Sequence, residues 1–160
     1  MHPELLSLCL FMFVTSCSPG PNNIVASHSG FNHGFKKTIP LMLGVIFGWT
    51  TLLLSMELGL IVIFKKYEFI QAIFKILGSL FLIYLAFKIS FSKNNKGKIL
   101  KTPIKFLEMF LFQFINPKSI VVAMTAISMF IDTQNNYIND IIVVTSVYFF
   151  MSIFSITSWC

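Results

Sequence analysis

The chain has 160 residues, of which 56% are hydrophobic, 16% are aromatic and only 11% are charged. Soluble domains carry about a quarter charged residues, so this composition excludes an ordinary soluble domain and predicts an integral membrane protein. The net charge of +6 does not indicate nucleic-acid binding, because all twelve basic residues are lysine and none is arginine, which contacts bases and phosphates bidentately.

Apolar residues form five long segments, at about residues 5–26, 39–64, 69–91, 106–131 and 138–160. Each has about the length of a membrane-spanning helix, which needs roughly 20 mostly apolar residues. Barrel strands alternate in polarity and span the bilayer in about ten residues, so they do not fit these runs. We predict an all-α, polytopic transmembrane helix bundle that forms one domain over residues 1–160.

The first segment is interrupted by TSCSPGPNNIVAS, which contains Pro19, Gly20 and Pro21. These residues disfavour helix, and unpaired backbone groups in hydrocarbon are tolerated only where neighbouring helices or a wet cavity satisfy them. Asn22 and Asn23 would follow the break at the N-terminus of a restarted helix, where free N–H groups favour a carboxylate. The alternatives are a plain proline kink, or a helix that begins at Pro21.

A second interpretation of the N-terminus rests on VTSC, which ends at Cys17 and resembles a bacterial lipobox. The opening MHPE lacks the positive charges of a signal peptide, and a lipoprotein does not usually continue into further spanning segments. We therefore favour an uncleaved first segment. Cys9, Cys17 and Cys160 have no C-x-x-C or zinc-type spacing and are best explained as buried membrane cysteines.

The second segment carries a glycine pair and an acid. GVIFG, from Gly44 to Gly48, is a small-xxx-small pair that allows close helix packing. Glu57 lies inside the segment, and charged residues within spans usually face a partner or a water path. It is the candidate for coupling transport to protons. The alternatives are a pair with a lysine such as Lys75 or Lys118, or a position near the interface.

The fourth segment contains QFINPKS, with Asn116, Pro117 and Lys118 inside an apolar run. The first and fourth segments correspond if the fold is a three-plus-three repeat, and an odd number of spans makes the two halves inverted. Proline-interrupted segments at matching places in two halves are the best sequence indication of a transporter's central site. Lys118 would attract a substrate carboxylate there, or alternatively extend to the lipid headgroups.

The loops predict the orientation. The loop after the second segment carries Lys65 and Lys66, and the loop after the fourth carries no lysine. The loops after the first and third segments carry seven lysines: Lys36, Lys37, Lys93, Lys96, Lys98, Lys101 and Lys105. The positive-inside rule therefore places these two loops in the cytoplasm and the N-terminus outside.

Four motifs in order resemble the LysE/RhtB family of amino-acid exporters over nearly the whole chain: SPGPNNIVASHSGFNHGFKKTIPLMLGVIFG, FKILGSLFLIYLAFK, FLFQFINPKSIVVAMTAISMFI and SITSW. The resemblance implies a six-helix exporter in the bacterial inner membrane, driven by the proton gradient. It implies a central site at the two breaks, formed by residues 19–23 and 116–118. The expected partners are a small amino acid or related metabolite and membrane lipid, with no nucleic acid.

The sequence departs from the family pattern at several positions. Trp49 stands where an acidic residue often follows the second glycine, Phe81 where tyrosine is usual, and Ala86 where glycine is usual. The chain ends at Cys160, where a sixth helix is expected, so the inverted repeat is predicted to be incomplete and a homo-oligomer would compensate. The alternative function is a truncated, non-transporting membrane remnant or a helical interaction subunit. No nucleotide loop, nucleophile elbow or metal cluster is present, so no enzyme, cofactor or metal is predicted.

Overall fold

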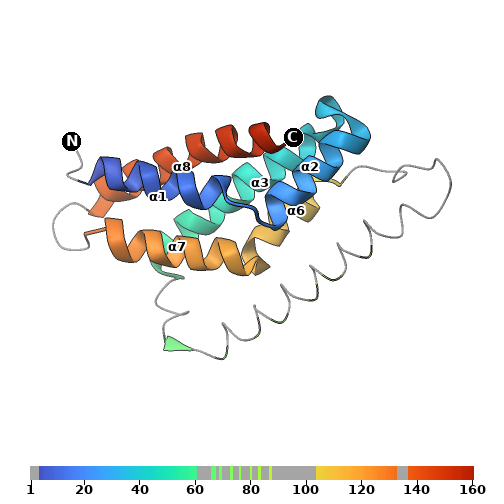
Figure 1. Ribbon diagram of the computed structural model, residues 1–160. Coiled ribbons are helices and arrows are strands. Elements are labelled where there is room, and N and C mark those ends of the chain that lie inside the picture. Colours follow the sequence, from blue (N-terminus) through green and yellow to red (C-terminus); the bar gives the residue numbers. More distant parts are fainter. Residues whose placement is uncertain are drawn as a thin grey trace.

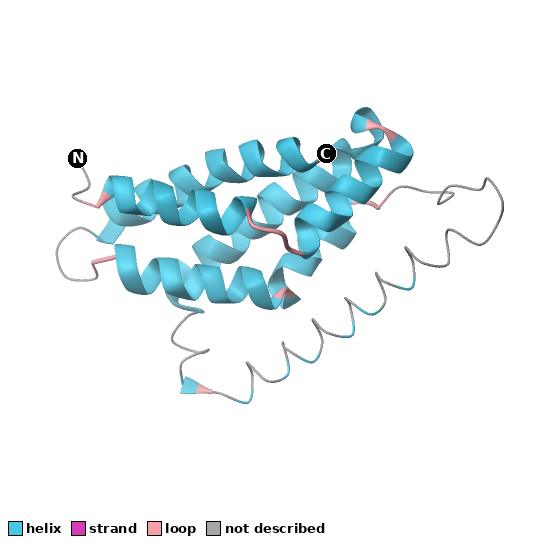
Figure 2. Cartoon of the chain, in the orientation of Figure 1, coloured by secondary structure: helices cyan, strands magenta, loops and turns pink. Residues whose placement is uncertain are grey.

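The computed structural model describes residues 4–60, 104–132 and 137–160, together with positions 66, 67, 69, 73, 76, 80, 83 and 87. Every regular element in this part of the chain is a helix (Figure 2). Most of the third predicted segment and most of the lysine-rich loop after it, including Lys75 and Lys98, lie outside the described residues.

The described helices form membrane-spanning units of two kinds. Two long, apolar spans cover Phe35–Gly59 and Tyr137–Trp159. The first joins α3 (Phe35–Ser55) to the π-helical turn η1 (Met56–Leu60), and the second is α8 (Tyr137–Trp159). Two bent pairs have the length and apolarity of a span only when each pair is taken together: α1 (Leu5–Cys17) with α2 (Pro21–His33), and α6 (Phe106–Ile115) with α7 (Pro117–Phe130). The prediction of an all-α polytopic bundle is confirmed.

Both proline-containing stretches break their helices. The axes of α1 and α2 differ by 54°, and those of α6 and α7 by 60°. Pro21 and Pro117 are the first residues of α2 and α7, where the missing N–H costs no helical hydrogen bond and the fixed φ already suits a helix. The two broken spans run through the bundle in opposite directions (Figure 1).

Helices α3 and α6 pack with their backbones in close contact. A Cβ added at Gly48 would lie 2.6 Å from the carbonyl oxygen and 2.8 Å from the Cα of Phe110. A Cβ at Gly44 would clash with the carbonyl oxygen of Phe106. The packing role predicted for this glycine pair is therefore confirmed, and the close approach holds α6 against the middle of α3.

One glycine makes the turn between α2 and α3. Gly34 ends α2 and begins α3 with a φ of 81°, and its N–H donates to the carbonyl of Gly30. This φ lies in the region that residues with a Cβ rarely adopt. Helix α2 continues to His33, so the polar sequence after the first apolar run is helical up to this turn.

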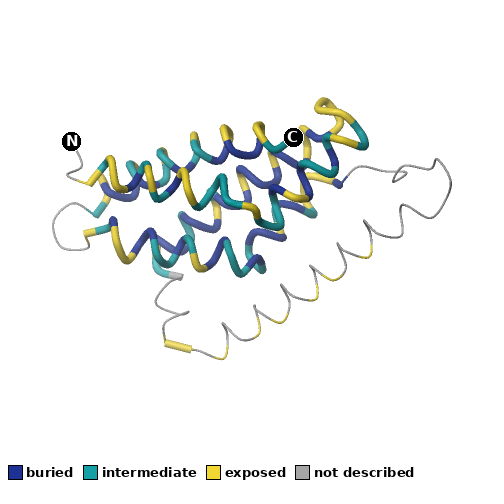
Figure 3. Tube along the Cα trace, in the orientation of Figure 1, coloured by how far each residue is buried: buried dark blue, intermediate teal, exposed yellow. Residues whose placement is uncertain are grey.

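Two apolar clusters fill the bundle. The first contains Leu8, Met12, Trp49, Leu52, Leu53, Met56, Ile120, Ala123, Ala126, Ile127, Phe130, Val144 and Tyr148. The second lies among α2, α3 and α6 and contains Val25, Ala26, Leu41, Met42, Val45, Ile46, Ile104, Met109, Phe112 and Ile156. Many other large apolar side chains point outward, and exposed positions follow the outer faces of the helices (Figure 3).

The two ends of the bundle differ in charge. The starts of α3 and α6 lie at one end, with the end of α8, whereas the starts of α1 and α8 and the end of α7 lie at the other (Figure 1). The first end carries Lys36, Lys37 and Lys105. The second carries Asp132 and Asp140, and the N–H of Asp132 donates to Asp140 Oδ2 at 2.9 Å.

Candidate functional site

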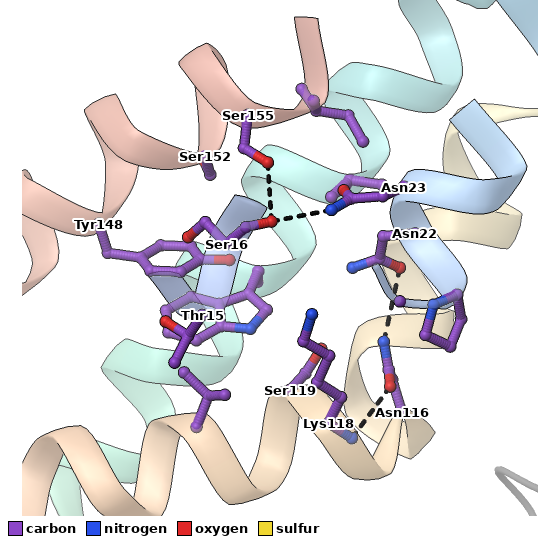
Figure 4. Close-up of a pocket in the computed structure, with 16 residues that line it drawn as sticks. Thr15, Ser16, Asn22, Asn23, Asn116, Lys118, Ser119, Tyr148, Ser152 and Ser155 are labelled. Carbon is purple, nitrogen blue, oxygen red and sulfur yellow. Dashed lines mark hydrogen bonds between the residues drawn. The ribbon is translucent and has the colours of Figure 1, made fainter. Parts of the chain in front are cut away.

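A small cavity lies where the two breaks meet (Figure 4). Its volume is about 40 Å³, which is room for about three waters. Its wall consists of Thr15, Ser16, Gly20, Pro21, Asn22, Asn23, Val45, Trp49, Asn116, Lys118, Ser119, Val122, Tyr148, Ser152, Ser155 and Ile156. Among these described lining residues, Lys118 alone carries a charge.

The end of α1 leaves carbonyl groups that an unbroken helix would have paired. The Ser18 hydroxyl donates to the Thr15 carbonyl at 3.0 Å. The Ser16 carbonyl accepts from Asn23 Nδ2 at 2.8 Å and from Ser155 Oγ at 2.7 Å. The Ser18 side chain thus replaces the N–H that Pro19 lacks, and side chains of α2 and α8 replace the main-chain donor that the Ser16 carbonyl loses at the break.

The last two carbonyls of the break are paired in the same way. Trp159 Nε1, on α8, donates to the Cys17 carbonyl at 3.2 Å. The Ser18 carbonyl accepts from Lys118 Nζ at 2.9 Å and from Asn23 Nδ2 at 3.1 Å. Donors from three neighbouring helices therefore pair the carbonyls at the end of α1, as freed backbone groups within a bilayer require.

Lys118 links the second break to the first. Its ammonium donates to the carbonyl of Ser18 and, at 2.8 Å, to the Ser18 hydroxyl. The side chain passes over Gly20, where an added Cβ would lie 2.9 Å from both Cδ and Nζ of the lysine. Lys118 therefore turns into the bundle rather than toward headgroups. An ammonium has three N–H donors, so one remains beyond the two bonds to Ser18.

The N-terminus of α2 is open at the cavity. Its N-cap is Gly20, and no side chain caps it. Pro21 has no N–H, so the first main-chain donors are those of Asn22 and Asn23, which an α-helix leaves without intrahelical partners. These amides and the positive end of the helix dipole lie in the same wall as Lys118.

A buried amide network joins the two breaks. Asn22 and Gln113 exchange two side-chain hydrogen bonds, of 2.8 and 3.1 Å. Gln113 Oε1 also accepts from Ser119 Oγ at 3.1 Å, and Gln113 Nε2 donates to the Met109 carbonyl at 2.8 Å. At the second break, the Asn116 side chain caps α7 by accepting from the Lys118 N–H at 3.1 Å. The network fixes α2 relative to α6 and α7.

Aromatic rings form the opposite wall. Trp49 stacks on Tyr148, with ring centroids 3.2 Å apart and planes 18° apart. Tyr148 lies across the cavity from Asn22 and Asn116 (Figure 4). The cavity therefore has a polar, positive end at the breaks and an aromatic end between α3 and α8.

A family model described as "LysE type translocator" matches residues 13–160. The chain belongs to the LysE-type translocator family. It is 31% identical to the cysteine/O-acetylserine efflux protein of Salmonella paratyphi A over 163 residues, covering 99% of this chain and 82% of that protein. The protein of the same description in Escherichia coli is 29% identical with the same coverage. No solved structure matches the chain.

In this LysE-type translocator, most of the predicted site residues line the cavity, but not all. Pro19 is exposed, Pro117 is half-buried, and neither is a lining residue. They shape the backbone of the breaks. The predicted residues that line the cavity are Gly20, Pro21, Asn22, Asn23, Asn116 and Lys118.

Glu57 lies away from the cavity, in η1 of the translocator. Its side chain is 3% exposed, and Thr145 Oγ1 donates to Oε2 at 2.9 Å. The Tyr137 hydroxyl donates to its main-chain carbonyl. Within the described part of the chain, Oε1 has no hydrogen-bond partner. Glu57 is eight residues beyond Trp49, about 12 Å at the rise of an α-helix, toward the end of the bundle that carries the aspartates.

The sequence prediction missed the contribution of α8. Tyr148, Ser152 and Ser155 all line the cavity, and their spacing of four and three residues puts them on one helix face. Polar residues at helical spacing within an otherwise apolar span were the available signal.

Proposed function

We propose that this LysE-type translocator exports small amino acids and related metabolites across the bacterial inner membrane, and that the cavity between the two breaks is its substrate site. The observation that carries the proposal is the convergence of Lys118 and the open N-terminus of α2 on one wall of the cavity. Both groups favour an anion, and both line the same cavity.

The substrate carboxylate binds at the polar end of the cavity. The third ammonium donor of Lys118 and the main-chain amides of Asn22 and Asn23 supply its hydrogen bonds. Hydrogen bonds to charged groups each contribute about 1.5–3 kcal/mol. Two of the three donors of Lys118 are bonded to Ser18, so a carboxylate that draws the ammonium further into the cavity weakens its bonds to the first break.

The lining also favours substrates of a particular net charge. A carboxylate is absent from the described lining residues, so the substrate ammonium is bound by neutral acceptors. The hydroxyl oxygens of Ser119, Ser152 and Ser155 fit this task, because each retains lone pairs after donating its proton. We therefore assign zwitterionic or anionic amino acids, and not cationic ones, as substrates. Relatives described as cysteine/O-acetylserine efflux proteins support this assignment.

Export proceeds by alternating access, driven by the proton gradient. The lysine-bearing end of the bundle faces the cytoplasm and the N-terminus faces outward, in accord with the positive-inside rule. Glu57 carries the coupled proton, since a buried carboxylate with few partners is costly in its charged form. Its distance from the cavity means that coupling passes through α3 and not through direct contact with the substrate.

The test is efflux of serine from cells loaded with a serine-containing dipeptide. Lys118→Met should lower the initial efflux rate about tenfold or more, since each 1.4 kcal/mol of lost binding is tenfold. The matched control is Lys105→Met, which removes an exposed lysine outside the cavity. Equal rates in the two variants, at equal protein in the membrane, would exclude Lys118 from the site.

The same assay tests the driving force and the alternative function. A protonophore should reduce efflux by the parent chain, and Glu57→Gln should remove that gradient dependence. Gradient dependence that survives in Glu57→Gln excludes this residue as the coupling group. A chain that inserts normally but releases no serine would instead support a non-transporting membrane or interaction subunit.

A further inference from the structure

The aromatic end of the cavity is built from two buried rings. Trp49 is 2% exposed and Tyr148 is 6% exposed, and both line the cavity. Their stacking, with centroids 3.2 Å apart, joins α3 to α8. Each ring has only two side-chain torsions, so the pair presents a wall with little freedom to adjust.

Packing behind the rings fixes this wall. Trp49 and Tyr148 belong to the larger apolar cluster, whose other members include Leu8, Met12 and Leu52 from α1 and α3. Protein interiors are close-packed, and core side chains sit in single rotamers. The rings therefore have no free volume into which they could retreat when a solute enters.

The opposite end of the cavity is adaptable. Lys118 is a long, flexible side chain that is held there by two hydrogen bonds to Ser18. The cavity volume is about 40 Å³, and the lysine is the part of its wall with the most side-chain torsions. Movement of Lys118 makes room for the carboxylate, but it makes no room near Trp49.

We propose that Trp49, stacked on Tyr148, limits the length of the side chain that the transporter accepts. This inference rests on the proposed function. A carboxylate held at the breaks directs the substrate side chain toward the rings. A short side chain then fits against the indole, and a long or aromatic one collides with it. Trp49 is thus a specificity-determining residue that acts by exclusion, as hydrophobic pockets do.

The experiment measures efflux of serine and of phenylalanine from cells loaded with the corresponding dipeptides. Trp49→Ala should raise the ratio of phenylalanine to serine efflux about tenfold or more, because even one methylene changes discrimination by about 10–200-fold. Phe47→Ala is the matched control on α3. It also removes an aromatic ring, but Phe47 is exposed on the outer face and does not line the cavity, so the ratio should not change.

A second variant is available in case the first one does not fold. Removal of a large buried ring destabilises a protein, so membrane levels of Trp49→Ala are measured by quantitative blot. If that variant does not accumulate, Trp49→Phe replaces it, and it should raise the ratio by a smaller factor in the same direction. An unchanged ratio in the variant that accumulates overturns the inference.

The parent chain separates the two proposals. Serine efflux by the parent, with no gain of phenylalanine efflux in the Trp49 variant, overturns the size limit and leaves the exporter function standing. Phenylalanine efflux by the parent as fast as serine efflux also overturns the size limit alone. No efflux of either amino acid by the parent, at normal membrane levels, overturns the proposed function and this inference together.

Discussion

The two breaks that meet at the cavity satisfy their backbone groups from different sources. At the second break, Asn116 caps α7 with its own side chain, through the 3.1 Å bond from the Lys118 N–H. At the first break, the N-cap is Gly20 and has no side chain to offer. The carbonyls of Ser16 and Cys17 depend instead on donors from other elements, among them Ser155 and Trp159.

This difference assigns the two breaks different tasks. The cap at the second break is local, so the main-chain N–H of Lys118 is paired without help from other helices. The first break keeps free N–H groups at the start of α2 and responds to movement of α7 and α8, which supply its donors. A substrate anion that takes the ammonium of Lys118 from Ser18 acts on the break that depends on its neighbours. Three substitutions test this contrast, in order of decreasing expected effect on stability.

Asn23→Leu should be the most destabilising of the three. Asn23 is buried and donates to the carbonyls of both Ser16 and Ser18, and each lost hydrogen bond costs about 1 kcal/mol. We expect a loss of about 2 kcal/mol, measured by thermal or denaturant unfolding of the purified protein in detergent. Asn32→Leu is the control, since the Asn32 side chain donates to the His28 carbonyl of its own helix, away from the break. Equal losses in both variants would show that the first break does not depend on Asn23.

Asn116→Ala should have a smaller effect on stability. It removes the side-chain cap of α7, and N-cap truncations cost about 1 kcal/mol. Asn116→Ser should restore most of this loss, because serine caps a helix about as well as asparagine. The same unfolding measurement applies. A serine variant as unstable as the alanine variant would mean that Asn116 acts through its 3.5 Å contact with Asn22 and not as a cap.

Gly20→Ser should change stability least and transport most. A serine at this position gives the first break the kind of cap that the second already has, and it adds a few tenths of a kcal/mol of helix stability. Its Cβ, however, would fall 2.9 Å from Lys118 Cδ and Nζ, so the flexible lysine must shift. We expect normal unfolding and serine efflux reduced about tenfold. Full efflux would show that neither the open amides of α2 nor the position of Lys118 matters.

The bundle and its breaks were predictable from the sequence because their causes are local. Long apolar runs, Pro21 and Pro117, and the pair Gly44 and Gly48 each determine the nearby backbone. The partners of the freed carbonyls were not predictable in this way. Ser155 is 139 residues from Ser16, and only the packing of α8 against α1 brings the two together.

Only the residues of the candidate site that lie in the two breaks were predictable from the sequence. Trp49 stood out in the sequence only as a departure from the family pattern, and Tyr148 did not stand out at all. Their stacking depends on how α3 and α8 are rotated. Glu57 shows the converse limit. Its charge made it a candidate in the sequence. The position of its side chain depends on the π-helical turn η1, which places it away from the cavity.

The bond from Trp159 to the Cys17 carbonyl has a consequence for biosynthesis. The ribosome delivers α1 first and α8 last among the described helices, and the two residues are 142 positions apart. Asn23 reaches its carbonyls as soon as α2 has been made, whereas the Cys17 carbonyl waits until α8 enters the membrane. Among the described helices, the first to be made therefore receives a hydrogen bond from the last.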